Sequence, residues 1–155
     1  IRDRVPYIAL ENLIAGDGTS VVKTLFPDVK DMALLKRINN YLVENLSVER
    51  LLSAVTILDA TKVISSVSDM MTELEENTGI RLTNNQRVTL YVHVSAMIER
   101  LIRNEPPLVY KVVSSEERKQ GCTKIKRALR NIESSYGIKV DQNELNYLYD
   151  IVFQL

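Results

Sequence analysis

The sequence is poor in the residues that build disulfides, metal sites and turns. It has one cysteine, Cys122, one histidine, His93, and no tryptophan. One cysteine cannot close an internal disulfide, and one cysteine with one histidine cannot supply the ligands of a zinc site unaided. Glycine and proline occur only five and four times in 155 residues. We therefore expect neither a cofactor nor a metal, and few interruptions of regular structure.

Long apolar runs and an excess of charge are also absent. No apolar segment approaches the roughly 20 residues that cross a bilayer, and the start, Ile1 to Arg4, lacks the basic and apolar layout of a signal peptide. Twenty basic and twenty acidic residues cancel, so no net field attracts a polyanion or an anionic membrane. We expect a cytoplasmic segment without nucleic-acid or membrane contact. The missing initiator Met suggests a piece of a longer protein.

Most of the chain repeats apolar residues every three or four positions, which places them on one face of a helix. This pattern predicts an all-α protein. The first expected helix runs from an N-cap at Asp28 to about Leu46, and a second follows nearby through Leu51 to Val55. The apolar stripe expected on the first helix comprises Leu34, Leu35, Ile38, Tyr41, Leu42 and Leu46.

The remaining helices are bounded by residues with clear cap preferences. One is expected from after Asp59 to Gly79, where glycine tolerates a left-handed C-cap. Capping boxes, in which the side chain three residues after the N-cap bonds back to it, open the others. The expected boxes and helices are Thr83 with Gln86, to about Asn104; Ser114 with Glu117, to Gly137; and Asp141 with Glu144, to the end.

An internal repeat organises these helices. The segment Leu74–Asn85 returns without a gap as Ile132–Asn143, and each copy ends a helix at glycine, crosses an apolar-basic-apolar connector and starts the next helix. Helix pairs of this kind bury their apolar faces only against each other. We therefore predict a helical bundle made of two pseudo-repeated antiparallel helix pairs. In this register His93 corresponds to Ile151.

His93 lies just off the apolar line of its predicted helix. That line contains Leu90, Val94 and Met97, whereas the side of His93 also carries Thr89 and Arg100. A boundary position suits an imidazole that stays mostly neutral near pH 7 and that a partner can reach. A lone histidine at a helix edge is also compatible with a purely packed or solvated role.

The stretch Leu90–Leu101, Leu-Tyr-Val-His-Val-Ser-Ala-Met-Ile-Glu-Arg-Leu, preceded by Gly79–Leu82, resembles the core motif of PTS regulation domains (PRDs), where PTS is the sugar phosphotransferase system. The version is that of LevR-type, sigma-54-dependent activators. Leu58–Ala60 and Gly137–Asp141 also fit, so the similarity covers most of residues 29–155. The segment Val5–Leu13 is similar to the sequence joining phosphotransferase-like domains of those activators to their C-terminal PRD.

The resemblance implies a PRD over residues 29–155, with residues 1–28 as a linker or the tail of a preceding phosphotransferase-like domain. It further implies that His93 receives a phosphoryl group from HPr or a sugar-specific enzyme IIB, and that the domain forms a homodimer within a larger activator. Many PRDs carry a second histidine in the final helix. Because Ile151 stands there, dual-site control within this domain is not expected.

Other candidate residues have weaker support. Arg100 reaches a phosphate on His93 only if its side chain bends back, and a carboxylate partner is the alternative. Thr89 either orients the ring or bonds a backbone carbonyl. We interpret Cys122 as an ordinary thiol, and Glu75 and Glu76 as solvated.

Two further functional classes remain open at this point. In one, the chain is a dimerisation module in which His93 only packs. In the other, it is a fragment of an RNA-binding antiterminator, which the neutral charge and the lack of a basic, aromatic segment oppose. An independent enzyme is not expected, since phosphotransfer to His93 makes the chain a substrate. No hydrolytic triad has support in the sequence.

Overall fold

The computed structural model describes residues 19–54 and 57–153 of the chain. Within these ranges the regular structure is entirely helical, which confirms the all-α prediction. The helices are α2 (Thr19–Leu25), α3 (Met32–Ala54), α4 (Ala60–Thr78), α5 (Asn84–Ile102), α6 (Glu116–Ala128), α7 (Arg130–Tyr136) and α8 (Gln142–Phe153). The segment Val5–Leu13, which resembles the sequence joining phosphotransferase-like domains to a PRD, lies outside the described residues.

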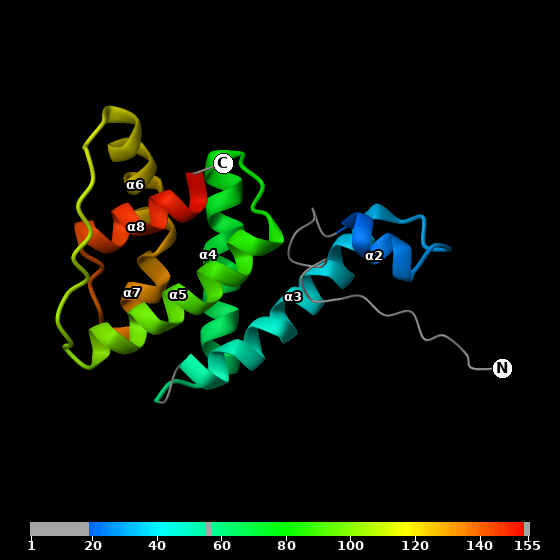
Figure 1. The fold of residues 1–155 in the computed structure, drawn as a ribbon, viewed down its shortest axis with the longest axis horizontal. Helices are drawn as coiled ribbons and strands as arrows, with labels where there is room; N and C mark the ends of the chain where they lie inside the picture. The colour runs from blue at the N-terminus through cyan, green and yellow to red at the C-terminus, as the bar shows by residue number, and fades with distance from the viewer. Residues whose placement is uncertain (1–18, 55–56, 154–155) are drawn as a thin grey trace.

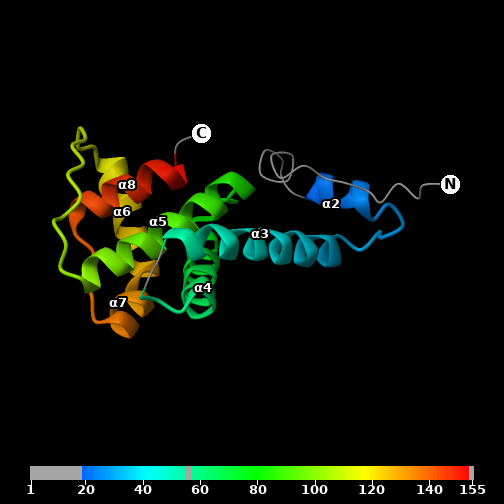
Figure 2. The ribbon, with the colours of Figure 1, turned by 60° about the horizontal axis from the view of Figure 1, so that its bottom comes forward.

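Helices α4 to α8 form a bundle; α3 packs against α5 and α4 and extends beyond them, with α2 beside its outer part (Figures 1 and 2). Helix α4 packs against α5, and α6 packs against α8; the two pairs meet through contacts of α4 with α6 and of α5 with α8. Fully buried side chains from both pairs, including Met71, Leu90, Ile125 and Leu148, share one hydrophobic core. The arrangement is therefore the expected association of two helix pairs.

The internal repeat reappears as repeated geometry. Gly79 and Gly137 end α4 and α7 with φ angles of 73° and 63°. A carboxylate one turn before each glycine accepts a hydrogen bond from the backbone of the connector: Glu75 from Leu82 N, and Glu133 from Val140 N, both at 2.8 Å. Each glutamate thus holds its own left-handed turn.

Glu75 is consequently not the solvated residue that we expected. Its side chain is 10% exposed, and both of its oxygens lie 3.0 Å from Nη2 of Arg87. Only Glu76 is exposed, as predicted. The sequence offers no partner for either of the two adjacent acids, whereas in the structure the connector folds back over Glu75 and bonds it through Leu82 N.

Helix α3 differs from the prediction in three ways. The Oδ1 atom of Asp31, rather than Asp28, accepts the backbone hydrogen bond of Ala33 at 2.9 Å. The helix continues over 23 residues to Ala54 instead of ending near Leu46. Leu34 and Tyr41 are 39% and 66% exposed, whereas Leu35 is buried against Val22 of α2 and Asn39 is buried against Asn84 of α5. One narrow apolar line, rather than the whole stripe, is buried there.

The second repeat also shows two differences. Ser115, rather than Ser114, caps α6 by accepting a hydrogen bond from Arg118 N at 3.1 Å, so the box with Glu117 is absent. The expected continuous helix is divided at Leu129 into α6 and α7. The boundaries of α4 and α5 were predicted correctly, including the box between Thr83 and Gln86.

Candidate functional site

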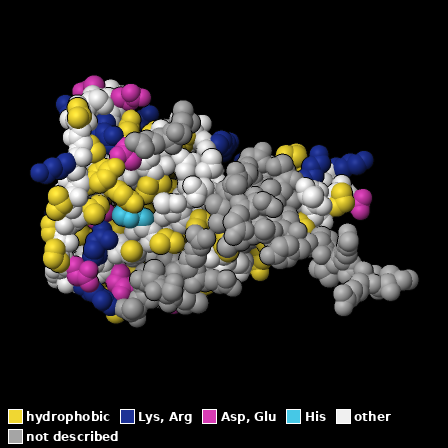
Figure 3. All heavy atoms as spheres, viewed as in Figure 1, with side chains coloured by type: hydrophobic (Ala, Val, Ile, Leu, Met, Phe, Trp, Pro, Cys, Tyr) yellow, Lys and Arg dark blue, Asp and Glu magenta, His cyan; other side chains and the backbone are white. Residues whose placement is uncertain are grey.

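His93 lies on α5 where this helix packs against α8. The start of α5 is fixed by the Thr83–Gln86 box, and Leu90, Val94 and Met97 face the core as the periodicity predicts. The His93 side chain is 15% exposed. Figure 3 shows its ring reaching the surface of the bundle among hydrophobic side chains. The predicted boundary position is therefore observed.

The ring contacts a buried carboxylate from the facing helix. Its Nε2 atom lies 3.2 Å from Oε2 of Glu144, whose side chain is only 2% exposed. The other oxygen of Glu144, Oε1, accepts a hydrogen bond from Nη2 of Arg100. Arg100 thus has a carboxylate partner, which was the alternative to a role in binding a phosphate on His93. Among the described residues, Glu144 is the one hydrogen-bond partner of the His93 ring.

The pseudo-symmetry of the bundle explains why Glu144 is placed there. Gln86 and Glu144 occupy the same position after the N-caps of α5 and α8, and Glu144 N donates to Oδ1 of its own cap, Asp141, at 3.0 Å. Gln86 reaches the end of α8, where its Nε2 donates to the carbonyls of Ile151 and Val152 at 2.9 and 3.1 Å. Glu144 makes the reciprocal contact with α5. It therefore meets His93, the counterpart of Ile151.

The environment keeps Glu144 ionised. Burial on its own would raise the pKa of this carboxyl, but the hydrogen bond from His93, the positive charge of Arg100 and its hydrogen bond outweigh that effect. The net result is a pKa below the ordinary value. At neutral pH the site consequently holds a buried anion between an imidazole and a guanidinium.

A pH-dependent contribution of Glu144 to stability follows from this lowered pKa. Because the unfolded chain binds the proton more readily, the stabilisation is complete above the ordinary pKa of 4.5 and is lost as pH falls through the folded value. We expect Glu144→Gln to lower the free energy of unfolding more at pH 7 than at pH 3. Urea denaturation of both proteins at the two pH values measures this difference, and an equal or larger effect at pH 3 would contradict it.

Aromatic side chains also pack next to the His93 ring. The His93 ring lies 4.3 Å from that of Tyr147, and Tyr147 meets Tyr110 edge-on at 5.2 Å. Tyr110 belongs to the extended connection between α5 and α6, and its hydroxyl donates to Asp150 on α8. Asp150 also accepts from Arg118 at 2.7 Å. Tyr147 therefore links His93 to the α5–α6 connection. A change at His93 would reach that connection through the Tyr147 ring.

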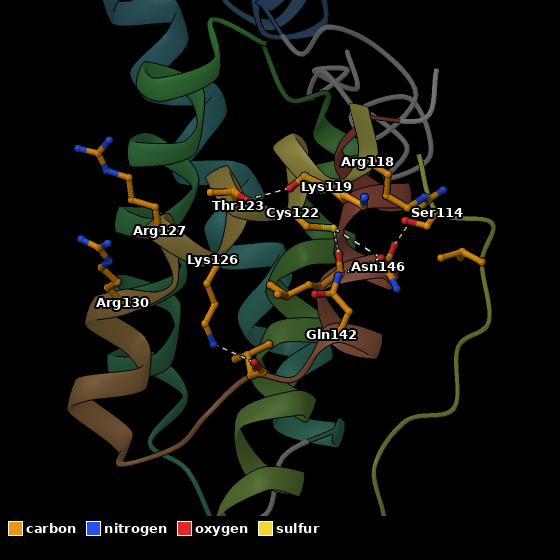
Figure 4. A pocket seen from close by; sticks show the side chains of 13 residues that line it. Ser114, Arg118, Lys119, Cys122, Thr123, Lys126, Arg127, Arg130, Gln142 and Asn146 are labelled. Atoms are coloured by element: carbon orange, nitrogen blue, oxygen red, sulfur yellow. Dashed lines mark hydrogen bonds between the residues drawn. The ribbon is translucent and has the colours of Figure 1, made fainter. Parts of the chain in front are cut away.

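The two other predicted site residues have different surroundings. The Thr89 hydroxyl donates to the carbonyl of Asn85 at 2.8 Å, which is the backbone-bonded alternative. Cys122 is 4% exposed and lies between α6 and α8, at a cleft of about 970 Å³ whose lining does not include His93 (Figure 4). Burial raises the pKa of its thiol. This environment matches the interpretation as an ordinary, unreactive cysteine.

Sequence reasoning missed Glu144 and Tyr147 as neighbours of His93. Glu144 was assigned only to a capping box, and it is 51 residues from His93 in the chain. The repeat nevertheless contained a signal, since Gln86 and Glu144 are equivalent and so are His93 and Ile151. Antiparallel packing of α5 on α8 then brings Gln86 to Ile151 and Glu144 to His93. Tyr147 has no comparable signal, because its counterpart in the first repeat, Thr89, is not aromatic.

No three His, Cys, Asp or Glu side chains gather into a metal-binding group within residues 19–54 and 57–153. In the same ranges, no helix combines the length and apolar character needed to span a membrane.

Comparison with known proteins gives two matches and one negative result. A curated relative, the transcriptional regulatory protein DagR of Salmonella typhimurium (strain 14028s / SGSC 2262), is 21% identical over 154 residues. The alignment covers 96% of this chain but only 16% of the relative, so the chain corresponds to a small part of that protein. No solved structure matches significantly. The family model of the PRD domain matches residues 68–154, which is more than half of the chain and runs from within α4 to the end of α8, and the chain therefore belongs to the PRD domain family.

Proposed function

We propose that this chain is a regulatory domain of a LevR-type, sigma-54-dependent transcription activator, and that phosphotransferase-system proteins phosphorylate His93 to tune transcription of sugar-utilisation genes. Membership in the PRD family and the relative described as a transcriptional regulatory protein support the regulatory class. In this proposal the donor is HPr or an enzyme IIB in the cytoplasm. The chain is the substrate of phosphotransfer and not its catalyst.

The observation that carries the proposal is the state of the His93 ring. It reaches the surface, and within the part of the chain that the structure describes only its Nε2 atom has a hydrogen-bond partner, Glu144. A histidine that accepts a phosphoryl group needs a nitrogen with an available lone pair and an edge that a donor can approach. A ring with both nitrogens bonded inside the core would fit the alternative in which His93 only packs.

Phosphorylation would change the electrostatics of the α5–α8 contact. A phosphoryl group adds about −1.5 to −2 charges, beside a Glu144 carboxylate that is already ionised. Arg100 is the nearby cation, because it bonds the same carboxylate. We expect the added charge and volume to change how α5 packs against α8 and to shift Tyr147, whose ring contacts that of His93. This movement would be the signal passed to the rest of the activator.

Phosphotransfer from purified donors tests the proposal. The chain is incubated with phosphorylated HPr and, separately, with phosphorylated enzyme IIB, and then analysed by mass spectrometry under non-acidic conditions. We expect one acid-labile phosphate, which is lost in His93→Ala and retained in Cys122→Ser. The second variant is the matched control, since it removes the other nucleophile. Transfer from neither donor, or labelling that persists in His93→Ala, would refute the assignment.

We further propose that the domain acts as a homodimer together with other domains of the same activator, with residues 1–28 as the connecting segment. The exposed Leu34 and Tyr41 on α3 support self-association, because apolar side chains that protrude from a helix favour contact with a partner. Sedimentation velocity would detect a species of twice the 17.7 kDa monomer mass.

A further inference from the structure

We propose that Nδ1 of His93 carries the phosphate, and that Glu144 is the positioning residue that selects this nitrogen. The inference rests on the proposed function of His93 and adds the reacting atom and the group that controls it. It follows from the contact between Nε2 and Oε2 of Glu144 at 3.2 Å.

A carboxylate in this position determines the tautomer of the ring. Ionised Glu144 only accepts hydrogen bonds, so the neutral imidazole has to carry its hydrogen on Nε2 to make the contact favourable. The opposite tautomer would place the Nε2 lone pair against the carboxylate lone pairs. With the hydrogen on Nε2, the free lone pair is on Nδ1. The nucleophilic atom is thereby specified before any donor arrives.

Glu144 is held too firmly to release Nε2 easily. Its side chain is 2% exposed, its backbone N–H is bonded to the Asp141 cap, and Arg100 holds its second oxygen. Turning the carboxylate away would leave a buried charge without its partners, which proteins avoid. Attack through Nε2 would require that movement, whereas attack through Nδ1 leaves all three interactions in place.

The transfer step balances with this assignment. The Nδ1 lone pair forms the new N–P bond while the bond from phosphorus to the donor nitrogen or sulfur breaks, and its electron pair stays on the donor atom. The hydrogen on Nε2 remains, so the phosphorylated ring gains a positive charge. That charge develops 3.2 Å from the carboxylate of Glu144. Glu144 therefore stabilises the ring as it reacts, in the way that a buried aspartate stabilises the imidazolium of a serine protease.

Because the chain has a single histidine, NMR reads both parts of the inference without assignment work. The chain is labelled with ring-¹⁵N histidine and studied at pH 8.5, where imidazoles are generally neutral. We expect a protonated Nε2 and an unprotonated Nδ1. Treatment with phosphoramidate, a small chemical phosphodonor, should then place the phosphate on Nδ1. Free histidine treated in parallel is the reference, because both of its nitrogens are open.

Variants separate positioning from folding. Glu144→Gln should reduce the rate of phosphorylation by phosphoramidate at least about tenfold, a loss typical of removing a charge that stabilises a reacting imidazole, and it should weaken the preference for hydrogen on Nε2. Glu117→Gln, at an exposed carboxylate in the first turn of α6, should change neither quantity. Melting curves confirm that both variants fold, and the tautomer is a readout that a purely structural role would leave unchanged.

The possible outcomes distinguish this inference from the proposed function. Phosphate on Nε2, hydrogen on Nδ1, or no reaction of the folded chain with phosphoramidate would each overturn the inference. Phosphate on Nδ1 from phosphoramidate, combined with no transfer from HPr or enzyme IIB, would uphold the inference about the ring and refute the proposed signalling function. Phosphate from a protein donor on Nε2 would uphold the proposed signalling function and refute the inference about the ring.

Discussion

Replacing Glu75 with alanine is expected to lower the free energy of unfolding by about 3 kcal/mol, a typical cost of breaking a buried ion pair on one side. Glu75 and Arg87 are 10% and 14% exposed in their side chains, so little water is present to replace the lost contact. The variant leaves the Arg87 guanidinium without its carboxylate. It also removes the acceptor of the Leu82 backbone N–H, which lies 2.8 Å from Oε1 of Glu75.

The repeat supplies two controls for this experiment. Glu76→Ala removes an adjacent, exposed carboxylate and should change stability by no more than about 0.5 kcal/mol. Glu133→Ala removes the equivalent carboxylate of the second repeat, but its partner Lys126 is 41% exposed in its side chain and can be hydrated. We therefore expect a smaller loss than for Glu75→Ala. Urea denaturation measures all three, and a Glu75→Ala protein as stable as Glu76→Ala would show that the connector does not depend on this pair.

Glu75 also shows how much of the fold the sequence could predict. The periodicity of apolar residues placed α4 and α5 correctly, and the repeated glycine connector predicted the pairing of two helical hairpins. Both copies carry a glutamate one turn before the glycine, at Glu75 and Glu133. A helical wheel cannot show that the connector folds back over that position, because the wheel describes one helix at a time. Contacts that cross between elements need the packed structure.

The same limit explains the misplaced helix starts. Asp28 and Asp31, and likewise Ser114 and Ser115, are all suitable N-cap residues by chemistry. Which member of each pair becomes the N-cap depends on where the helix packs against its neighbours. In the structure the N-caps are Asp31 and Ser115. The boundary position of His93 could be predicted from the sequence because helix periodicity is a local property. Its partner Glu144 could not, since that contact depends on how α5 and α8 cross.

Gly121→Ala is expected to destabilise the wild-type chain by about 1–2 kcal/mol and to stabilise a chain that lacks the Tyr149 ring. A Cβ atom on Gly121 would lie 2.3 Å from Cε2 and 2.6 Å from Cδ2 of Tyr149, well inside van der Waals contact. Overpacking of this kind costs about 1–3 kcal/mol. Alanine in place of glycine inside a helix contributes about 1 kcal/mol in the opposite direction. The steric term exceeds the helix term only while the ring is present.

The Tyr149 ring cannot move aside without further loss. It packs on Phe153 with 4.7 Å between ring centroids. The Arg118 guanidinium, which forms an ion pair with Asp150, lies 4.5 Å from the centre of the Tyr149 ring. Moving the ring would disturb the aromatic contact and the cation–π contact together. The position of the ring is therefore fixed. Because Gly121 has no side chain, α6 can pack closely against this ring and so against α8.

A double-mutant cycle measures this coupling. Gly121→Ala is made in the wild type and in Tyr149→Ala, and the four free energies of unfolding are compared. Tyr149→Ala is itself costly, but the cycle uses only the difference made by Gly121→Ala in each background, which should change sign and give a coupling of about 2–3 kcal/mol. The remaining contact, 3.2 Å from the new Cβ to Phe153, limits the gain in the second background. If Gly121→Ala has the same effect with and without the ring, close approach of α6 to α8 is not what requires glycine there.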